Sequence, residues 1–242
     1  MDFFNLNHGI IIECNFSGIE KLEAIVEGTN DLDFVVGYKV GAELAISSRI
    51  KDIVDTIKKY TNLPVIYDHQ KFGSDDPMFS GGSFLETLKD AGVDGLIIFP
   101  HGGVSSLEAV IRKCTDLGIF PIVGGDMVHE GYTEGEGGYI DNAAPQKMYI
   151  DGANFGAKHF VIPCTRLDRM RIYCHRLGNM VNNPILFITG VGVETCDDLV
   201  KACEIVKQYH SYVIIGREIT DEKDYRKATE KIWKKLPVSS PE

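Results

Sequence analysis

The chain has 242 residues, of which 44% are hydrophobic and 25% charged, so it is long enough for one large domain with a sizeable core. Its net charge of −10 argues against binding to nucleic acid or to an anionic membrane, because both are negatively charged. This charge does not exclude an anionic small ligand, since a binding site can be locally positive.

The six cysteines are scattered and form no CxxC pair, which disfavours a zinc site or a redox motif. The first residues lack a basic region followed by an apolar stretch, and no run approaches the roughly 20 apolar residues of a membrane span. We therefore expect a cytoplasmic protein without a signal peptide or a membrane segment.

Short, nearly continuous apolar runs alternate with helical segments along the chain, as is typical of strands that are covered on both faces. We expect eight strands, at Ile10–Cys14, Phe34–Val40, Val65–Tyr67, Gly95–Phe99, Phe120–Val123, His159–Ile162, Ile185–Ile188 and Tyr212–Ile215. We expect a helix after Ser17-Gly18-Ile19-Glu20, which has the spacing of a capping box, and further helices at Ala45–Tyr60, Ser83–Ala91, Ser105–Leu117, Gln146–Phe155, Arg166–Leu177, Thr195–Tyr209 and Asp221–Leu236.

Eight strands alternating with helices match an α/β fold of the (β/α)8 TIM barrel type in number and size. Because the composition does not change along the chain, we expect a single domain over residues 1–242. A doubly wound open sheet is the competing architecture. The Gly-rich stretch Gly124–Gly138 looks like a long mobile loop after the fifth strand, with Glu134 and Glu136 in solvent.

One strand ends in a cluster of charges within Pro64–Pro77. The apolar run before Asp68 stops abruptly, and Lys71, Asp75 and Asp76 follow within eight residues. This pattern fits an active site at the end of a buried strand, although a polar surface loop has the same composition.

If the chain is a barrel, its strand ends meet at one mouth. Glu13 and Lys39 then lie beside the charged cluster, and 189–192 (TGVG) and Gly216-Arg217 follow the last two strands. Phosphate in barrel enzymes commonly binds the loops after strands seven and eight, where Gly allows close approach and Arg adds a charged contact. The sequence thus predicts a phosphate site there.

These motifs resemble the orotidine 5′-phosphate decarboxylase family in register over nearly the whole chain. The segments that carry the resemblance are Tyr38-Lys39-Val40-Gly41, the Asp–Lys–Asp cluster ending in Asp75-Asp76-Pro77, Phe99-Pro100-His101-Gly102, Pro163-Cys164-Thr165-Arg166, Thr189-Gly190-Val191-Gly192 and Ile215-Gly216-Arg217-Glu218-Ile219-Thr220.

The resemblance implies decarboxylation of orotidine 5′-monophosphate to uridine 5′-monophosphate, a step of pyrimidine biosynthesis, without a cofactor or a metal. It implies a homodimer with shared active sites and a catalytic array of Lys39, Asp68, Lys71 and Asp75. Lys71 would protonate the substrate carbon as general acid. Asp75 would come from the partner subunit, although its neighbour Asp76 is the other candidate for that position.

By the same resemblance the substrate would contact Glu13, Gly190, Gly192, Gly216 and Arg217. The chain departs from the family pattern in several places. The DxKxxD spacing is one residue longer in each half, which a bulge at the strand end could absorb. At four positions that contact the ligand in the family, this chain has a different residue. Glu13 stands in place of an Asp, Phe79 in place of a hydroxyl residue, Val128 in place of a Ser and Glu194 in place of a Gln.

Two other functions remain open from the sequence. One is a Mg²⁺-dependent sugar-phosphate synthase or decarboxylase of the same barrel superfamily, favoured by Val128 and the lengthened spacing. The other is a non-catalytic binder of a phosphate ligand. Lys39 and the Ile215–Thr220 motif disfavour the first of these.

Overall fold

Eight parallel strands form a closed barrel in a computed structural model that describes residues 4, 6–68, 82–190 and 196–237. Each strand pairs with the next in the chain, and β8 pairs with β1. This closure leaves no open edge, so the fold is the predicted (β/α)8 barrel and not a doubly wound sheet. The strands are β1 His8–Cys14, β2 Val35–Gly41, β3 Val65–Asp68, β4 Gly95–Ile98, β5 Phe120–Gly124, β6 His159–Pro163, β7 Ile185–Thr189 and β8 His210–Ile215.

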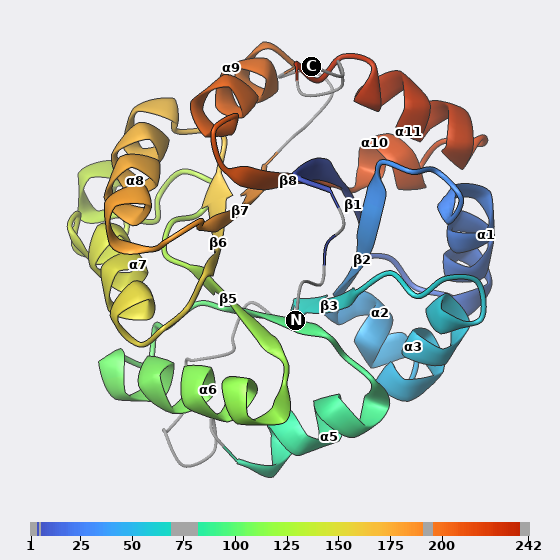
Figure 1. The fold of residues 1–242 in the computed structure, drawn as a ribbon, viewed down its shortest axis with the longest axis horizontal. Helices are drawn as coiled ribbons and strands as arrows, with labels where there is room; N and C mark the ends of the chain where they lie inside the picture. Colours follow the sequence, from blue (N-terminus) through green and yellow to red (C-terminus); the bar gives the residue numbers. More distant parts are fainter. Residues whose placement is uncertain (1–3, 5, 69–81, 191–195, 238–242) are drawn as a thin grey trace.

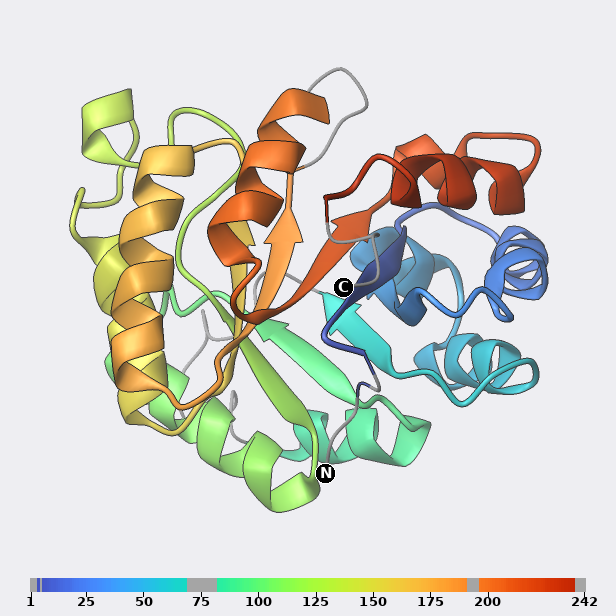
Figure 2. The same ribbon diagram turned by 45° about the horizontal axis from the view of Figure 1, so that its top comes forward.

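Helices surround the barrel on its outer side (Figure 1). In the described part of the chain they are α1 Ile19–Thr29, α2 Ala42–Ser47, α3 Ile50–Lys58, α5 Ser83–Ala91, α6 Val104–Leu117, α7 Ala144–Asn154, α8 Leu167–Met180, α9 Cys196–Val206, α10 Arg217–Thr220 and α11 Tyr225–Trp233, with a 3₁₀ turn η1 at Glu134–Glu136. Neighbouring helices pack on one another, as α7 and α8 do in the tilted view of Figure 2. Among the described helices none is both long enough and apolar enough to cross a membrane.

Two local predictions about the helices were wrong. The single helix expected over Ala45–Tyr60 is interrupted at Ser48, whose extended backbone (φ −146°, ψ 152°) separates α2 from α3. The capping box at the start of α1 does not form, because Gly18 is the N-cap with φ 103° and no side chain caps the helix. Ser17 instead donates a hydrogen bond to Glu43 Oε1 at 2.9 Å.

The strands are apolar on both faces because each face has its own core. On β1, Ile11 belongs to the cluster inside the barrel, whereas Ile10 and Ile12 pack toward the helices. The same alternation on β2 places Tyr38 on the helix side, so its neighbour Lys39 points into the barrel. Alternation therefore turns polar residues at the carboxyl ends of the strands toward the barrel axis.

The opposite end of the barrel is closed by an aromatic residue that precedes β1. The ring of Phe4 stacks on Tyr212 with centroids 4.4 Å apart and meets Phe120 and Phe187 edge-on at 5.6 and 5.8 Å. Tyr212 also donates its hydroxyl proton to the carbonyl of Leu6 at 2.7 Å. This plug leaves the carboxyl-end mouth as the side where a ligand can enter.

Candidate active site

A lysine between two carboxylates lies at the carboxyl ends of the first three strands. Lys39 Nζ donates hydrogen bonds to Glu13 Oε1 and to Asp68 Oδ2, each at 2.6 Å. The register of the strands explains why these three side chains lie together. Glu13 pairs with Lys39 across β1 and β2, and Gly41 pairs with Asp68 across β2 and β3. Residues that are 26 and 29 positions apart in the chain thus form one charged cluster.

The charge of Lys39 is maintained by its partners. Burial alone would lower the pKa of this ammonium, but the carboxylates of Asp68 and Glu13 outweigh it and raise the pKa above its ordinary value. Lys39 is therefore a permanent cation in the neutral pH range. It can neutralise the two acids that it binds.

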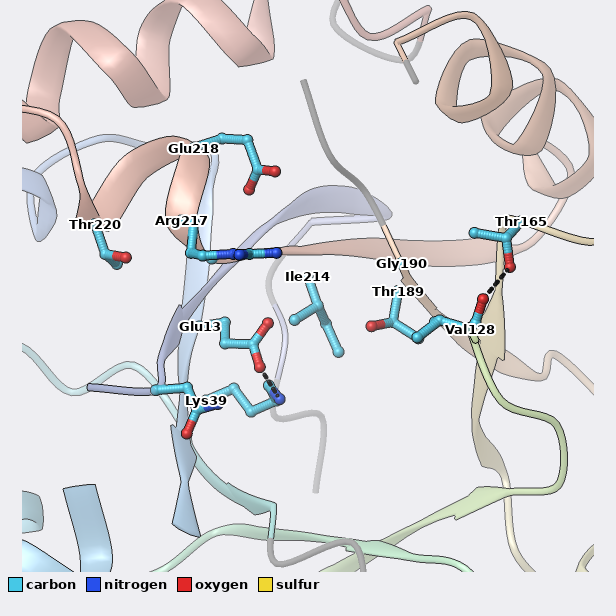
Figure 3. Close-up of a pocket in the computed structure, with 12 residues that line it drawn as sticks. Glu13, Lys39, Val128, Thr165, Thr189, Gly190, Ile214, Arg217, Glu218 and Thr220 are labelled. Atoms are coloured by element: carbon cyan, nitrogen blue, oxygen red, sulfur yellow. Dashed lines mark hydrogen bonds and ion pairs between the residues drawn. The ribbon is translucent and has the colours of Figure 1, made fainter. Parts of the chain in front are cut away.

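A pocket of about 600 Å³ opens beside this cluster. Its lining, drawn in Figure 3, comes from the strand ends and the loops that follow them. The lining residues are Glu13, Asn15, Lys39, Val128, Thr165, Thr189, Gly190, Ile214, Gly216, Arg217, Glu218 and Thr220.

Three of the predicted ligand-contact residues after strands seven and eight line this pocket. Gly190, Gly216 and Arg217 all line it, and the side chain of Arg217 extends across it in Figure 3. Gly190 has φ +89°, which favours glycine, and a Cβ there would lie 2.6 Å from Val128 Cγ1. A guanidinium and closely approachable backbone are the groups that bind phosphate well.

Several predicted residues lie outside the described part of the chain. They are Lys71, Asp75, Asp76, Phe79, Gly192 and Glu194. The structure thus brings together Glu13, Lys39 and Asp68 from the predicted array. The places of the others stay predictions.

The sequence interpretation assigned no role to six of the residues that line the pocket, which are Asn15, Thr165, Thr189, Ile214, Glu218 and Thr220. Four of them, Thr165, Thr189, Glu218 and Thr220, lie within the segments that carry the resemblance. All six lie at or just after the end of a strand, so reading every strand end for polar side chains would have found all but Ile214. In the described ranges, no group of three or more His, Cys, Asp or Glu side chains is arranged to hold a metal ion.

The loop predicted after β5 contains a short bridge and a 3₁₀ turn. Thr133 forms a β-bridge with Ile140, and η1 lies between them. The prediction that Glu136 lies free in solvent was wrong, because this carboxylate pairs with Arg166 at 2.9 Å and with Arg169 at 2.8 Å. Glu134, by contrast, is exposed as predicted.

Known proteins are similar to this chain in sequence. Orotidine 5′-phosphate decarboxylase from Pyrococcus furiosus is 30% identical over 222 residues, covering 90% of this chain and 92% of the relative. The enzyme of that name from Methanosarcina barkeri is 26% identical and covers 92% of both chains. No family model matches the sequence.

Solved structures show the same fold. Orotidine 5′-monophosphate decarboxylase from Methanocaldococcus jannaschii, complexed with the inhibitor BMP, superposes with a TM-score of 0.78 at 22% identity, covering 95% of this chain and 98% of the other. The orotidine 5′-phosphate decarboxylase structure from Pyrococcus horikoshii OT3 gives a TM-score of 0.75 at 20% identity and covers 96% and 100%.

Proposed function

Because the chain belongs to the orotidine 5′-phosphate decarboxylase family, we propose that the pocket at its barrel mouth is where it converts orotidine 5′-monophosphate to uridine 5′-monophosphate. The enzyme is thus a carboxy-lyase of pyrimidine biosynthesis. The observation that carries the placement is the Glu13–Lys39–Asp68 cluster at the edge of the pocket, in which Lys39 and Asp68 are buried.

The pocket separates two kinds of contact for such a ligand. Arg217, Gly190 and Gly216 offer a cation and close backbone approach, which suits the 5′-phosphate. Glu13 and Lys39 lie deeper along β1 and β2, where a carboxylate and an ammonium suit the ribose hydroxyls. The distant phosphate contact then supplies binding energy that holds the reacting carbon against Asp68.

The reaction follows from charge placement. The bond from C6 to the carboxylate breaks, its electron pair stays on C6, and CO2 leaves. Asp68 beside the substrate carboxylate disfavours the ground state, while the ammonium of Lys71 stabilises the developing carbanion and gives its proton to C6. Asp75 of the second subunit completes the alternating charges, and solvent returns the proton to Lys71. We expect no cofactor or metal in these steps.

A homodimer is consistent with apolar side chains around the mouth. Ile46 on α2, Phe84 on α5 and Val104 on α6 are exposed, Ile46 by 83%. They belong to the helices that follow β2, β3 and β4 in the chain. A second copy covering this face would bring its own residues to the site. Sedimentation analysis of Phe84→Asp should show more monomer than the unchanged chain, and Phe84 is not a pocket residue.

The decisive experiment measures absorbance of orotidine 5′-monophosphate with purified protein, with and without EDTA. We expect equal turnover in both. Turnover only with added Mg²⁺ would instead favour the sugar-phosphate type of chemistry, for which the apolar Val128 in the pocket is the supporting observation. Binding of uridine 5′-monophosphate without any turnover would leave a non-catalytic phosphate-ligand binder.

A further inference from the structure

Four charged side chains tie the segment 125–143, between β5 and α7, to the start of α8. We call Asp126, Glu136, Arg166 and Arg169 the loop clamp. They come from two elements that are separate in the chain, since the acids precede α7 and the arginines begin α8. The decarboxylation steps above use none of the four.

Arg169 forms the half of the clamp that reaches the buried carboxylate of Asp126. Its Nε lies 3.1 Å from Asp126 Oδ2, and its Nη2 donates to Glu136 Oε1 at 2.8 Å. The Asp126 carboxylate is 0% exposed and also accepts from the Tyr173 hydroxyl at 3.0 Å and from the Met127 N–H at 2.9 Å. A planar guanidinium can hold two carboxylates at once, whereas an ammonium presents one point charge.

Arg166 and its neighbour Thr165 form the half of the clamp that binds the backbone of Val128 and His129. Arg166 Nε lies 2.9 Å from Glu136 Oε1, and its Nη2 donates to the carbonyl of His129 at 2.7 Å. Thr165 Oγ1 donates to the carbonyl of Val128 at 3.0 Å. Two successive carbonyls of the loop are thereby fixed to the end of β6.

The charge state of the clamp is stable near neutral pH. Burial raises the pKa of Glu136, but the guanidinium groups of Arg166 and Arg169 more than offset this, so that the pKa lies below its usual value. Glu136 is therefore ionised wherever the enzyme is assayed near pH 7.

What the clamp holds in place is a wall of the pocket. Val128 lines the pocket, and its Cγ1 lies close enough to Gly190 that a Cβ there would be 2.6 Å away. In Figure 3 Val128 lies across the pocket from Glu13 and Lys39, with its carbonyl bonded to Thr165. The clamp thus bears on the side opposite to the charged cluster.

We propose that the loop clamp sets ligand affinity by holding Val128 against the pocket, with Arg169 as the positioning residue. Its kinetic consequence rests on the proposed function, because it is measured with orotidine 5′-monophosphate. Its structural consequence does not, because loop order can be measured without substrate.

The test compares Arg169→Gln with Arg112→Gln. Arg112 forms an exposed ion pair with Glu108 within α6, so this control loses an arginine without touching the pocket. We expect Arg169→Gln to raise KM by about tenfold and to leave kcat within about twofold of the wild-type value, because Glu13 and Lys39 lie on the opposite side of the pocket from Val128. Hydrogen exchange of peptides covering 125–143 should quicken in this variant and not in the control. Arg169→Lys should recover only part of the affinity.

A purely structural role would give another pattern. Loss of folded enzyme lowers kcat and leaves KM unchanged, and that result would overturn the proposal. Unchanged hydrogen exchange over residues 125–143 in Arg169→Gln would also overturn the proposal. This measurement needs no substrate, so it decides the proposal even if the wild-type chain does not turn over orotidine 5′-monophosphate. If Arg169→Gln does not fold, Glu136→Gln removes the partly exposed carboxylate of the clamp and keeps the buried Asp126, and the same KM and exchange criteria decide.

Discussion

Lys39 Nζ lies 2.6 Å from Asp68 Oδ2, and the two side chains are only 5% and 6% exposed. Removing two charges from water costs several kcal/mol, so an apolar pair of similar volume would serve a barrel interior as well or better. We therefore attribute this pair to the chemistry of the pocket and not to the stability of the fold.

Replacing Lys39 by Met tests this assignment. The variant removes the ammonium that both Glu13 and Asp68 bind at 2.6 Å, which we expect to cost about 3 kcal/mol of unfolding free energy and to abolish turnover. Urea unfolding and the absorbance assay measure the two effects. Lys51→Met, in an exposed pair with Asp55, is the control and should change stability by less than about 1 kcal/mol. Wild-type turnover in Lys39→Met would refute the role.

Replacing Arg217 by Ala tests the phosphate contact. A hydrogen bond to a charged group contributes about 1.5–3 kcal/mol, so we expect KM for orotidine 5′-monophosphate to rise roughly 10- to 100-fold. The affinity for uridine, which has no phosphate, should not change, and calorimetry can compare it with uridine 5′-monophosphate. Arg176→Ala, at an exposed position of α8, should have no effect on either ligand. Equal losses for both ligands would assign Arg217 to a different part of the substrate.

Replacing Gly190 by Ala should lower the stability of the folded protein for two separable reasons. The left-handed φ of +89° costs about 1–2 kcal/mol for a residue with a Cβ, and the new methyl group meets Val128. Gly131→Ala carries the first cost alone, because its φ is +79° and nothing lies within 4 Å of a Cβ there. We expect thermal unfolding to show the larger loss for Gly190→Ala. Adding Val128→Ala should restore only the steric part, and full restoration would show that φ strain is unimportant.

The stability of the barrel should fall as the pH drops below about 6.5 because of His159. Burial lowers the pKa of this ring from 6.5 to about 4, with a smaller contribution from Lys158. Between these values the unfolded chain binds the proton that the folded chain refuses, so unfolding becomes easier as pH falls. The loss is at most about 3 kcal/mol, at 1.36 kcal/mol per pKa unit.

Urea unfolding at pH 7 and pH 5 checks this dependence on acid. His159→Phe should be less sensitive over that interval, since the ring already lies among Phe120 and Phe187, with centroids 5.0 and 6.2 Å away. His175→Gln, at an exposed position, should retain the wild-type pH dependence. Identical pH profiles for His159→Phe and the unchanged chain would remove His159 as the cause.

The order of strands and helices could be predicted from the sequence because each strand is a short apolar run between Gly or polar breaks. The same apolarity concealed which residues face inward, since both faces of a barrel strand are covered. The inward direction of Lys39 follows only from its neighbours Tyr38 and Val40 packing toward the helices. The break at Ser48 and the failed cap at Ser17 depend on local backbone conformations that spacing alone does not specify.

The sequence by itself determined the fold class and predicted where the candidate site lies, because in a barrel every strand end leads to one mouth. Only the tertiary structure decided which of those residues touch. Strand register joins Glu13, Lys39 and Asp68 into one ion cluster. The packing of α8 against the segment after β5 builds the clamp behind Val128. Both contacts connect residues far apart in the chain, and no local pattern encodes such distances.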